Sequence, residues 1–223
     1  MKYFQELSET KIFKDSLEFE CQAMMYCFKT RFKTVDKNEK IITQGDEMTD
    51  VVLLVKGSAI AQNVDRLGNI SILMRYKKGE AYGIESAYAG DLVYKESLIA
   101  TEKCLVLFLN KHRIITPCSN RCKRHDVVVK NLMKIVAENN YKLLDKLTHM
   151  SKKTIRDKLL SYLSSVSEKA GSHYFEIPYN VTELANYLSV DRSALSNELS
   201  KLSKEGIIDY DKKQYRLIKV KEY

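Results

Sequence analysis

The fold of the C-terminal part of this chain is decided by one stretch, Val181-Thr-Glu-Leu-Ala-Asn-Tyr-Leu-Ser-Val-Asp-Arg-Ser-Ala-Leu-Ser-Asn-Glu-Leu-Ser-Lys-Leu202. Apolar residues recur at helical spacing at Leu184, Ala185 and Leu188, and Thr182 is expected to be the N-cap. Residues 189–191 then interrupt the helix, and a second apolar stripe follows at Leu195, Leu199 and Leu202. Two helices joined by so short a turn must cross steeply, and Ala185 provides the small residue required there. The pattern predicts a helix-turn-helix, whose second helix would enter the major groove of DNA.

The residues after this stretch distinguish a DNA-binding module from an ordinary helical hairpin. Residues 204–218 contain a helix stop at Gly206 and then two short strand patterns around a polar turn, which is the pattern of a wing. The segment from Ile155 to Ile218 resembles the DNA-binding domain of the Crp/Fnr transcription regulators. Such domains open with a helix like Ile155–Leu163, and their recognition helix begins with a pair like Arg192-Ser193.

The charge of the chain is unevenly distributed. Residues 1–110 contain 15 lysines and arginines against 16 carboxylates, whereas residues 111–223 contain 22 against 13. A nearly neutral front half and a basic back half fit a sensor joined to a nucleic-acid binder, although a solvated basic face is the alternative for a charge excess alone. With no secretory signal pattern at the N-terminus and no long apolar run, we expect a cytoplasmic protein without a membrane partner.

The cysteines and histidines indicate neither a metal site nor an enzyme. The five cysteines (Cys21, Cys27, Cys104, Cys118 and Cys122) are expected to be reduced thiols, and they do not reproduce the group with which Fnr-type relatives hold an iron–sulfur cluster. All four histidines lie outside residues 30–110, so a cupin-like metal site lacks its ligands. Because no Walker loop, Gly-x-Ser-x-Gly or His-Glu-x-x-His occurs either, we expect no catalysis and no cofactor.

The front half of the chain alternates short strand patterns with turns. Residues 3–28 are mostly helical in pattern, with Phe13, Leu17, Met24 and Phe28 on one apolar face, and strands then follow between turns at 36–39, 65–69 and 77–80. This spacing indicates a small β-barrel or sandwich. The order of the turns resembles the double-stranded β-roll of cyclic-nucleotide-binding domains, so the resemblance to the Crp/Fnr family extends over nearly the whole chain.

A long helix is predicted between these two parts, from about Asp126 to Met150. Its apolar seam packs either against its own chain or against a second copy, and the resemblance favours the second because family members dimerise through this helix. The polar member of the seam, Asn139, would pair with its symmetry mate and fix the register. The expected dimer residues are Val129, Leu132, Val136, Asn139 and Leu143.

The predicted effector pocket departs from the pattern of cyclic-nucleotide binders. Gly79, Glu80 and Gly83 match the opening of their phosphate cassette, but the ribose glutamate falls on Ile84 and the arginine-serine pair on Tyr94-Lys95. Because a phosphate without its arginine loses about 1.5–3 kcal/mol, we expect no binding of cyclic AMP in the usual way. The pocket, which also includes Tyr82, either holds an unidentified small-molecule effector or is filled by tyrosines, with Tyr76, Tyr82, Tyr88 and Tyr94 as candidates.

The resulting expectation is an α+β regulator that binds a near-palindromic DNA operator as a homodimer, with RNA polymerase as a further partner. Residues 1–120 would form a jelly-roll-like β-roll sensor, 121–150 the dimerisation helix and 151–223 the winged helix-turn-helix. The alternative is a sensing or protein-interaction module whose winged helix does not read DNA. The expected DNA-binding residues are Thr182, Asp191, Arg192, Ser193, Ser196, Asn197 and Lys201.

Overall fold

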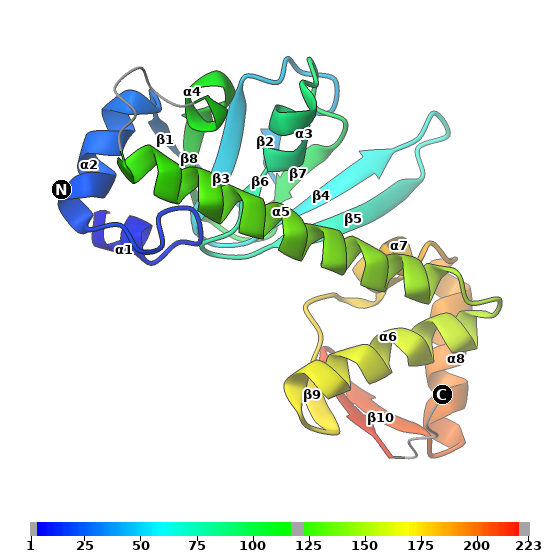
Figure 1. Cartoon of the computed structure of the whole chain (residues 1–223). Helices are drawn as coiled ribbons and strands as arrows, with labels where there is room; N and C mark the ends of the chain where they lie inside the picture. Colours follow the sequence, from blue (N-terminus) through cyan, green and yellow to red (C-terminus); the bar gives the residue numbers. More distant parts are fainter. Residues whose placement is uncertain (1–3, 117–122, 219–223) are drawn as a thin grey trace. The chain divides into compact units, whose positions relative to one another are not determined.

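The computed structural model describes residues 4–116 and 123–218. The chain divides into two compact units, which are described separately below (Figure 1). The first comprises residues 1–69 and 73–140, and the second comprises residues 141–223 together with 70–72.

The first unit is built on a β-roll of two four-stranded antiparallel sheets. One sheet has the strand order β1-β8-β3-β6, and the other has the order β2-β7-β4-β5. In the first sheet Leu53 of β3 lies opposite Leu107 of β8, which places two apolar strands side by side. The strands are β1 (Arg31–Val35), β2 (Lys40–Ile42), β3 (Asp50–Lys56), β4 (Ala59–Val64), β5 (Ile70–Tyr76), β6 (Ala81–Tyr82), β7 (Ser97–Ala100) and β8 (Cys104–Asn110).

Short helices accompany the strands of the roll, and the first two differ from the helical segment predicted over residues 3–28. The helical pattern over residues 3–28 is two helices, α1 (Phe4–Ser8) and α2 (Glu18–Cys27), separated by a turn. Leu17 is the N-cap of α2 and is 60% exposed, so it is not part of the apolar face on which Met24 and Phe28 are buried. Two further short helices are α3 (Ile84–Ala89) and α4 (Lys111–Ile115).

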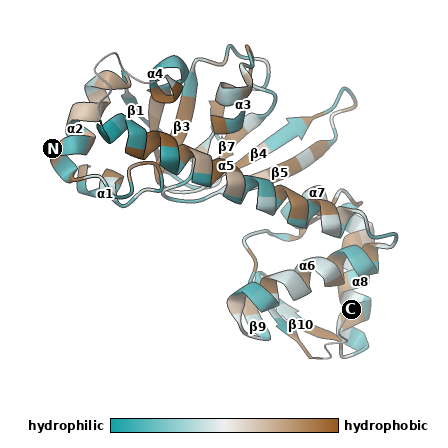
Figure 2. Cartoon of the chain, viewed as in Figure 1, coloured by the Kyte–Doolittle hydropathy of each residue, from teal (hydrophilic) through white to brown (hydrophobic). Residues whose placement is uncertain are grey.

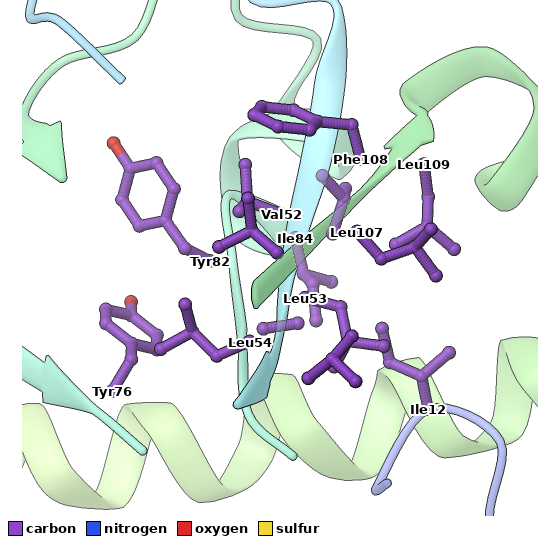
Figure 3. Packing of buried hydrophobic residues seen from close by; sticks show 14 of the residues in the cluster. Ile12, Val52, Leu53, Leu54, Tyr76, Tyr82, Ile84, Leu107, Phe108 and Leu109 are labelled. Carbon is purple, nitrogen blue, oxygen red and sulfur yellow. The ribbon is translucent and has the colours of Figure 1, made fainter. Parts of the chain in front are cut away.

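The core of the first unit is formed mainly by the central strands β3 and β8. All residues of β3 except Lys56 are buried, which explains its continuous apolar run. Tyr76 and Tyr82 belong to the same buried cluster as the β3 leucines (Figure 3). The apolar side chains of α2 and of the long helix α5 complete this core.

Helix α5 (Lys123–Met150) is the predicted long helix, and polar and apolar residues alternate along it (Figure 2). Its first half lies against the β-roll, where Val128, Leu132 and Ile135 are buried in the core (Figure 1). Asn131 of the same face donates from its side-chain amide to the carbonyl oxygens of Ile12 and Lys14. This face of α5 is therefore part of the first unit's own interior.

The second unit contains the predicted winged helix-turn-helix. Its helices are α6 (Ile155–Ala170), α7 (Val181–Leu188) and α8 (Arg192–Lys204). The wing strands β10 (Ile208–Asp211) and β11 (Gln214–Leu217) pair as expected, and a third strand, β9 (Tyr174–Glu176), joins β11. Ala185 is buried, as its expected place at the crossing of α7 and α8 requires, and Leu195, Leu199 and Leu202 of α8 are buried as well.

The turn between β3 and β4 provides a test of the β-roll packing. Gly57 has a φ of +86°, and a Cβ there would lie 2.7 Å from both Cys104 Sγ and the Lys103 carbonyl oxygen. We expect Gly57→Ala to lower the free energy of unfolding by about 2–4 kcal/mol, since it adds a clash to a left-handed backbone. The matched control is Gly68→Ala, because Gly68 has a φ of +85° but nothing within 4 Å of its Cβ position. Denaturant unfolding of the full-length variants measures both, and equal losses would contradict the close packing of this turn.

Candidate nucleic-acid interface and sensor pocket

Helix α7 begins with a capping box, and its N-cap lies two residues before the predicted N-cap. Asn180, and not Thr182, is the N-cap: its side chain accepts from Glu183 N–H, and the Glu183 carboxylate accepts from Asn180 N–H. The Asn-x-x-Glu spacing is a recognisable signal of this motif. Thr182 is an exposed residue of the first turn of α7.

The turn between α7 and α8 is built by Ser189 and Asp191. Ser189 ends α7 in the left-handed region, with φ 52° and ψ 56°, at the position where a turn glycine is common in the family that this segment resembles. Asp191 is the N-cap of α8, and its carboxylate accepts from Ala194 N–H at 2.8 Å. Asp191 thus has a structural task in the turn, in addition to its exposure beside the recognition helix.

The outward face of α8 contains the five expected DNA-binding residues that belong to this helix, whereas Thr182 lies on α7 and Asp191 is the N-cap of α8. Two further residues continue this face along the helix at spacings of three and four, Ser200 and Lys204, and the same spacing in the sequence was the signal for them. The Ser200 hydroxyl donates to the Ser196 carbonyl oxygen at 3.1 Å, so it is engaged with its own helix. The exposed residues of this face are Arg192, Ser193, Ser196, Asn197, Ser200, Lys201 and Lys204.

The carboxylates near α8 are bound by Arg156 of α6, which sequence reasoning did not identify. Arg156 Nε donates to Glu198 at 2.6 Å, and its two terminal nitrogens donate to Glu205 at 2.9 Å and 2.6 Å. The hydrogen bonds that Arg156 donates to Glu205 and Glu198 raise the pKa of Arg156, and the bonds to Glu205 lower the pKa of that carboxyl. Glu183 and Asp191 are likewise occupied by backbone N–H groups.

The electrostatic result is a recognition helix whose outward face carries cations and hydroxyls. The carboxylates of α7, of α8 and of its cap are held in local hydrogen bonds, while the side chains of Arg192, Lys201 and Lys204 face solvent. Lysine and arginine attract phosphates, and short hydroxyl and amide side chains can donate to phosphates or to base edges. This face has the chemistry required to bind duplex DNA.

The predicted effector pocket of the β-roll is occupied by the protein's own side chains. Gly83 is the left-handed N-cap of α3, and a Cβ there would lie 3.3 Å from Met48 Cε and 3.9 Å from the Tyr94 ring. The hydroxyl of Tyr94 donates to the Asp50 carbonyl oxygen at 2.6 Å, and that of Tyr82 donates to Glu96. Met48, Tyr82 and Tyr94 therefore occupy the space beside the cassette, and both tyrosine hydroxyls have hydrogen-bond partners.

Three of the four candidate tyrosines fill this region. Tyr76 meets Tyr82 edge to face at 5.7 Å, and Tyr82 stacks on Tyr94 at 6.0 Å. Burial raises the pKa of all three hydroxyls, so they are neutral in the folded protein. The fourth candidate, Tyr88, is 42% exposed and does not fill the pocket.

The residues at the cassette depart from the pattern of cyclic-nucleotide binders at two positions. Gly79 and Glu80 form the turn before β6, but Ile84 is fully buried in the apolar core where a ribose carboxylate is expected. Lys95 is exposed and pairs with Asp91 at 3.0 Å instead of pointing to the cassette. The structure thus brings Tyr82, Gly83, Ile84 and Tyr94 together in the interior and leaves Lys95 outside.

Two of the five expected dimer residues lie elsewhere than predicted. Leu132 is fully buried in the core of the first unit, and Asn139 is 4% exposed. The Asn139 amide donates to the Glu85 carboxylate of α3 at 2.7 Å, so it is engaged within its own chain and is not free to pair with a symmetry mate. Glu138, beside it, binds Lys11, which also lies 3.6 Å from Glu80. Hydrogen bonds and ion pairs therefore connect this face of α5 to the cassette and to α3.

The exposed and partly exposed apolar residues of α5 follow a heptad pattern. This pattern differs from the predicted seam by one residue at two positions, Met133 in place of Leu132 and Asn140 in place of Asn139. Its members are spaced alternately by four and three residues, and Asn140, in place of Asn139, is the polar one. Met133 is 64% exposed, Leu143 is 44% exposed and Leu147 is 62% exposed. The complete seam consists of Val129, Met133, Val136, Asn140, Leu143, Leu147 and Met150.

Other kinds of site find no support in the described part of the chain. Cys21 and Cys104 are buried and Cys27 is exposed, whereas Cys118 and Cys122 lie outside the described residues. Among residues 4–116 and 123–218, no three histidines, cysteines or carboxylates gather as metal ligands would. No helix in these ranges is long and apolar enough to span a bilayer.

Comparison with known proteins gives the class of the molecule. Residues 32–120 match the family model of the cyclic nucleotide-binding domain, and residues 157–222 match that of the Crp-like helix-turn-helix domain. This order of domains defines a transcription regulator with a β-roll followed by a winged helix, and not an enzyme. The chain belongs to the Crp/Fnr family of transcription regulators.

Solved structures share this fold at low sequence identity, while no curated protein matches the sequence. The regulator CLP of Xanthomonas campestris, described as c-di-GMP responsive, has a TM-score of 0.71 at 13% identity, covering 89% of this chain and 98% of its own. A CooA mutant from Carboxydothermus hydrogenoformans has a TM-score of 0.69 at 16% identity, covering 87% and 86%. FixK2 from Bradyrhizobium japonicum has a TM-score of 0.66 at 17% identity, covering 85% and 93%.

The role of Arg156 can be tested by uncovering the carboxylates that it binds. We expect Arg156→Gln to weaken DNA binding about tenfold, because the freed Glu198 and Glu205 would repel phosphates beside the recognition helix. Titration of a fluorescent duplex with the full-length variant measures this effect. The double variant Arg156→Gln/Glu198→Gln should recover part of the affinity. If removing the Glu198 charge recovers none, the loss has a structural cause and the electrostatic interpretation fails.

Proposed function

We propose that the protein is a cytoplasmic, sequence-specific regulator that binds a near-palindromic operator as a homodimer. Residues 1–120 would form the sensor, 121–150 the dimerisation helix and 151–223 the DNA-binding domain. The observation that carries the proposal is the outward face of α8, where Arg156 forms ion pairs with Glu198 and Glu205 while cations and hydroxyls are exposed. RNA polymerase remains a proposed partner on the ground of the family's role in transcription.

Recognition of the DNA base sequence would depend on side chains in the first two turns of α8. Arg192 is placed to bind a guanine edge or a phosphate, and Ser193 and Ser196 are short donors beside it. Asn197 can bind adenine in bidentate fashion. Thr182 at the start of α7 and Lys201 further along α8 would contact phosphates on either side, which positions the helix without selecting a sequence.

The experiment that tests this function is selection of bound duplexes from a random-sequence pool, with and without cyclic AMP. We expect enrichment of a two-fold symmetric site whose half-sites lie about one DNA turn apart, and no change on adding cyclic AMP. Arg192→Ala should then weaken binding to that site by about 1–3 kcal/mol. An equal loss on unrelated DNA would make Arg192 a phosphate contact. No DNA binding at any salt concentration would favour a protein-interaction module instead.

Dimerisation through α5 is supported by the heptad seam. Apolar residues at its first and fourth positions are typical of a parallel helix pair, and they are partly or largely exposed in the protomer. A pair of Asn140 side chains facing each other across the two-fold axis would select one register at some cost in stability. The face that carries Leu132 and Asn139 would remain bound to the roll.

The seam can be tested with two exposed side chains of the same helix. We expect Met133→Asp to convert the dimer to a monomer, because it places a charge in the apolar seam. Tyr141→Asp is the control: Tyr141 is 73% exposed but lies off the seam, so this variant should stay dimeric. Sedimentation of both variants decides the question. A dimeric Met133→Asp protein would mean that another surface joins the copies.

We further propose that the β-roll does not bind cyclic nucleotides in the usual way. The tyrosine packing beside Gly83 and the burial of Ile84 support this, since a ligand would have to displace Tyr82 and Tyr94 from their hydrogen bonds. Within this chain, the region of the cassette is already joined to α5 by the Glu85–Asn139 hydrogen bond and by Lys11, which lies between Glu80 and Glu138. An unidentified small-molecule effector that binds here would therefore have to rearrange Tyr82 and Tyr94.

A further inference from the structure

The last turns of α5 are held in the second unit by two buried titratable side chains. Lys146 is 6% exposed and His149 is 4% exposed. The Lys146 ammonium lies 5.0 Å from the centre of the Tyr187 ring of α7, and the His149 ring meets Tyr162 of α6 edge to face at 5.7 Å. These contacts join α5 to both helices behind the recognition helix.

The aromatic residues around this joint form one cluster. Tyr162 and Tyr187 lie 5.4 Å apart, and Tyr179 stacks on Tyr187 at 4.9 Å. Burial raises the pKa of Tyr187 to about 12, with a further contribution from the charge of Asp145, so the ring stays neutral. The cluster therefore offers His149 an apolar wall on one side.

His149 has a hydrogen-bonding partner, Ser161, that can adapt to the charge of the ring. Its Nδ1 lies 2.8 Å from the Ser161 hydroxyl, which can donate to a neutral ring or accept from a protonated one. Burial lowers the pKa of His149 below its usual value; the charge of Asp145 opposes this effect, and those of Lys169 and Lys152 add to it. Lys169 also forms an ion pair with Asp145, the carboxylate whose charge opposes the effect of burial. The folded joint thus favours neutral His149.

Solvent can reach the joint through a groove between the end of α5 and α6. The groove has a volume of about 420 Å³ and is lined by hydroxyl and charged side chains as well as by His149. Besides Asp145 and Lys152, the titratable groups on its walls are Asp157 and Glu168. A proton from water therefore has a short path to His149 when the joint opens.

We propose that the joint made by His149, Ser161 and Tyr162 is a proton-responsive coupling between α5 and the winged helix. At neutral pH the uncharged imidazole packs against Tyr162 and holds the end of α5 on α6. On acidification the proton binds His149 more strongly in an opened joint than in the packed one, so the coupling loosens. The consequence for DNA rests on the proposed function, because two recognition helices in a dimer are positioned through this joint.

The direction of the pH effect follows from linkage. A histidine whose folded pKa is lowered stabilises the packed joint above its unfolded pKa of about 6.5, and this stability is lost as the pH falls below that value. Lys146 acts in a separate window: burial lowers its pKa to about 8, so its effect on stability changes above that pH. Mild acidification therefore acts through His149.

The first measurement is the titration of His149 by NMR, which the chain makes tractable because it has only four histidines. We expect the His149 ring signals to titrate at lower pH in the folded protein than in urea, where about 6.5 is usual. His149→Gln identifies the signals by their loss. Titration of His149 at or above the value in urea would overturn the proposal.

The second measurement compares pH 7.5 with pH 5.5 for wild type, His149→Gln and the exposed-site control His173→Gln. We expect wild type and control to lose urea stability in the second unit and to bind the selected operator several-fold less tightly at pH 5.5. His149→Gln should change less than twofold. General electrostatics predicts the opposite sign, because added positive charge tightens DNA binding. A His149→Gln protein with the wild-type pH response would refute the coupling, whereas loss of DNA binding at every pH with the stability difference intact would refute only the proposed function.

Discussion

The structure depends on the way in which α5 divides its surface among three environments. One face buries Val128, Leu132 and Ile135 in the core of the β-roll and ties Asn139 to Glu85. Its last turns bury Lys146 and His149 among the tyrosines of the second unit. A third face keeps Met133 and Leu147 exposed. Since neighbouring positions of a helix are 100° apart, a shift of one residue changes which environment a side chain enters.

In the β-roll, the side chains beside the cassette pack closely against one another. The cassette turn and its glycines are kept, but Met48 and Tyr94 occupy the space beside Gly83. Each buried tyrosine hydroxyl that enters this space needs a partner, and Asp50 and Glu96 provide them for Tyr94 and Tyr82. The Lys11 ion pairs and the Glu85–Asn139 hydrogen bond connect this region to α5. The arrangement fits a regulator whose sensor is held together by its own side chains.

In the winged helix, the carboxylates on and beside the recognition helix are bound by local donors. Glu198 would place a negative charge on the recognition helix, yet its side chain is only 15% exposed and is bound by Arg156. Glu183 and Asp191 are consumed as parts of helix caps. The exposed charges on the outward face of α8 are therefore positive, because Glu183, Asp191 and Glu198 are each bound by a local donor.

The sequence by itself determined the class of fold, the order of the domains and the outward residues of α8, because helical spacing, turn residues and the buried run of β3 are local signals. It also showed that Ile84 and Lys95 break the cyclic-nucleotide pattern. The N-cap was placed at Thr182 instead of Asn180 because local patterns leave helix ends open by one or two residues. Only the tertiary structure decided that Asn139 faces Glu85 and Asn140 faces outward, that Arg156 reaches both Glu198 and Glu205, and that His149 is enclosed by Tyr162 and Ser161. These are contacts between residues distant in the chain, and their partners are selected by packing, which no local spacing encodes.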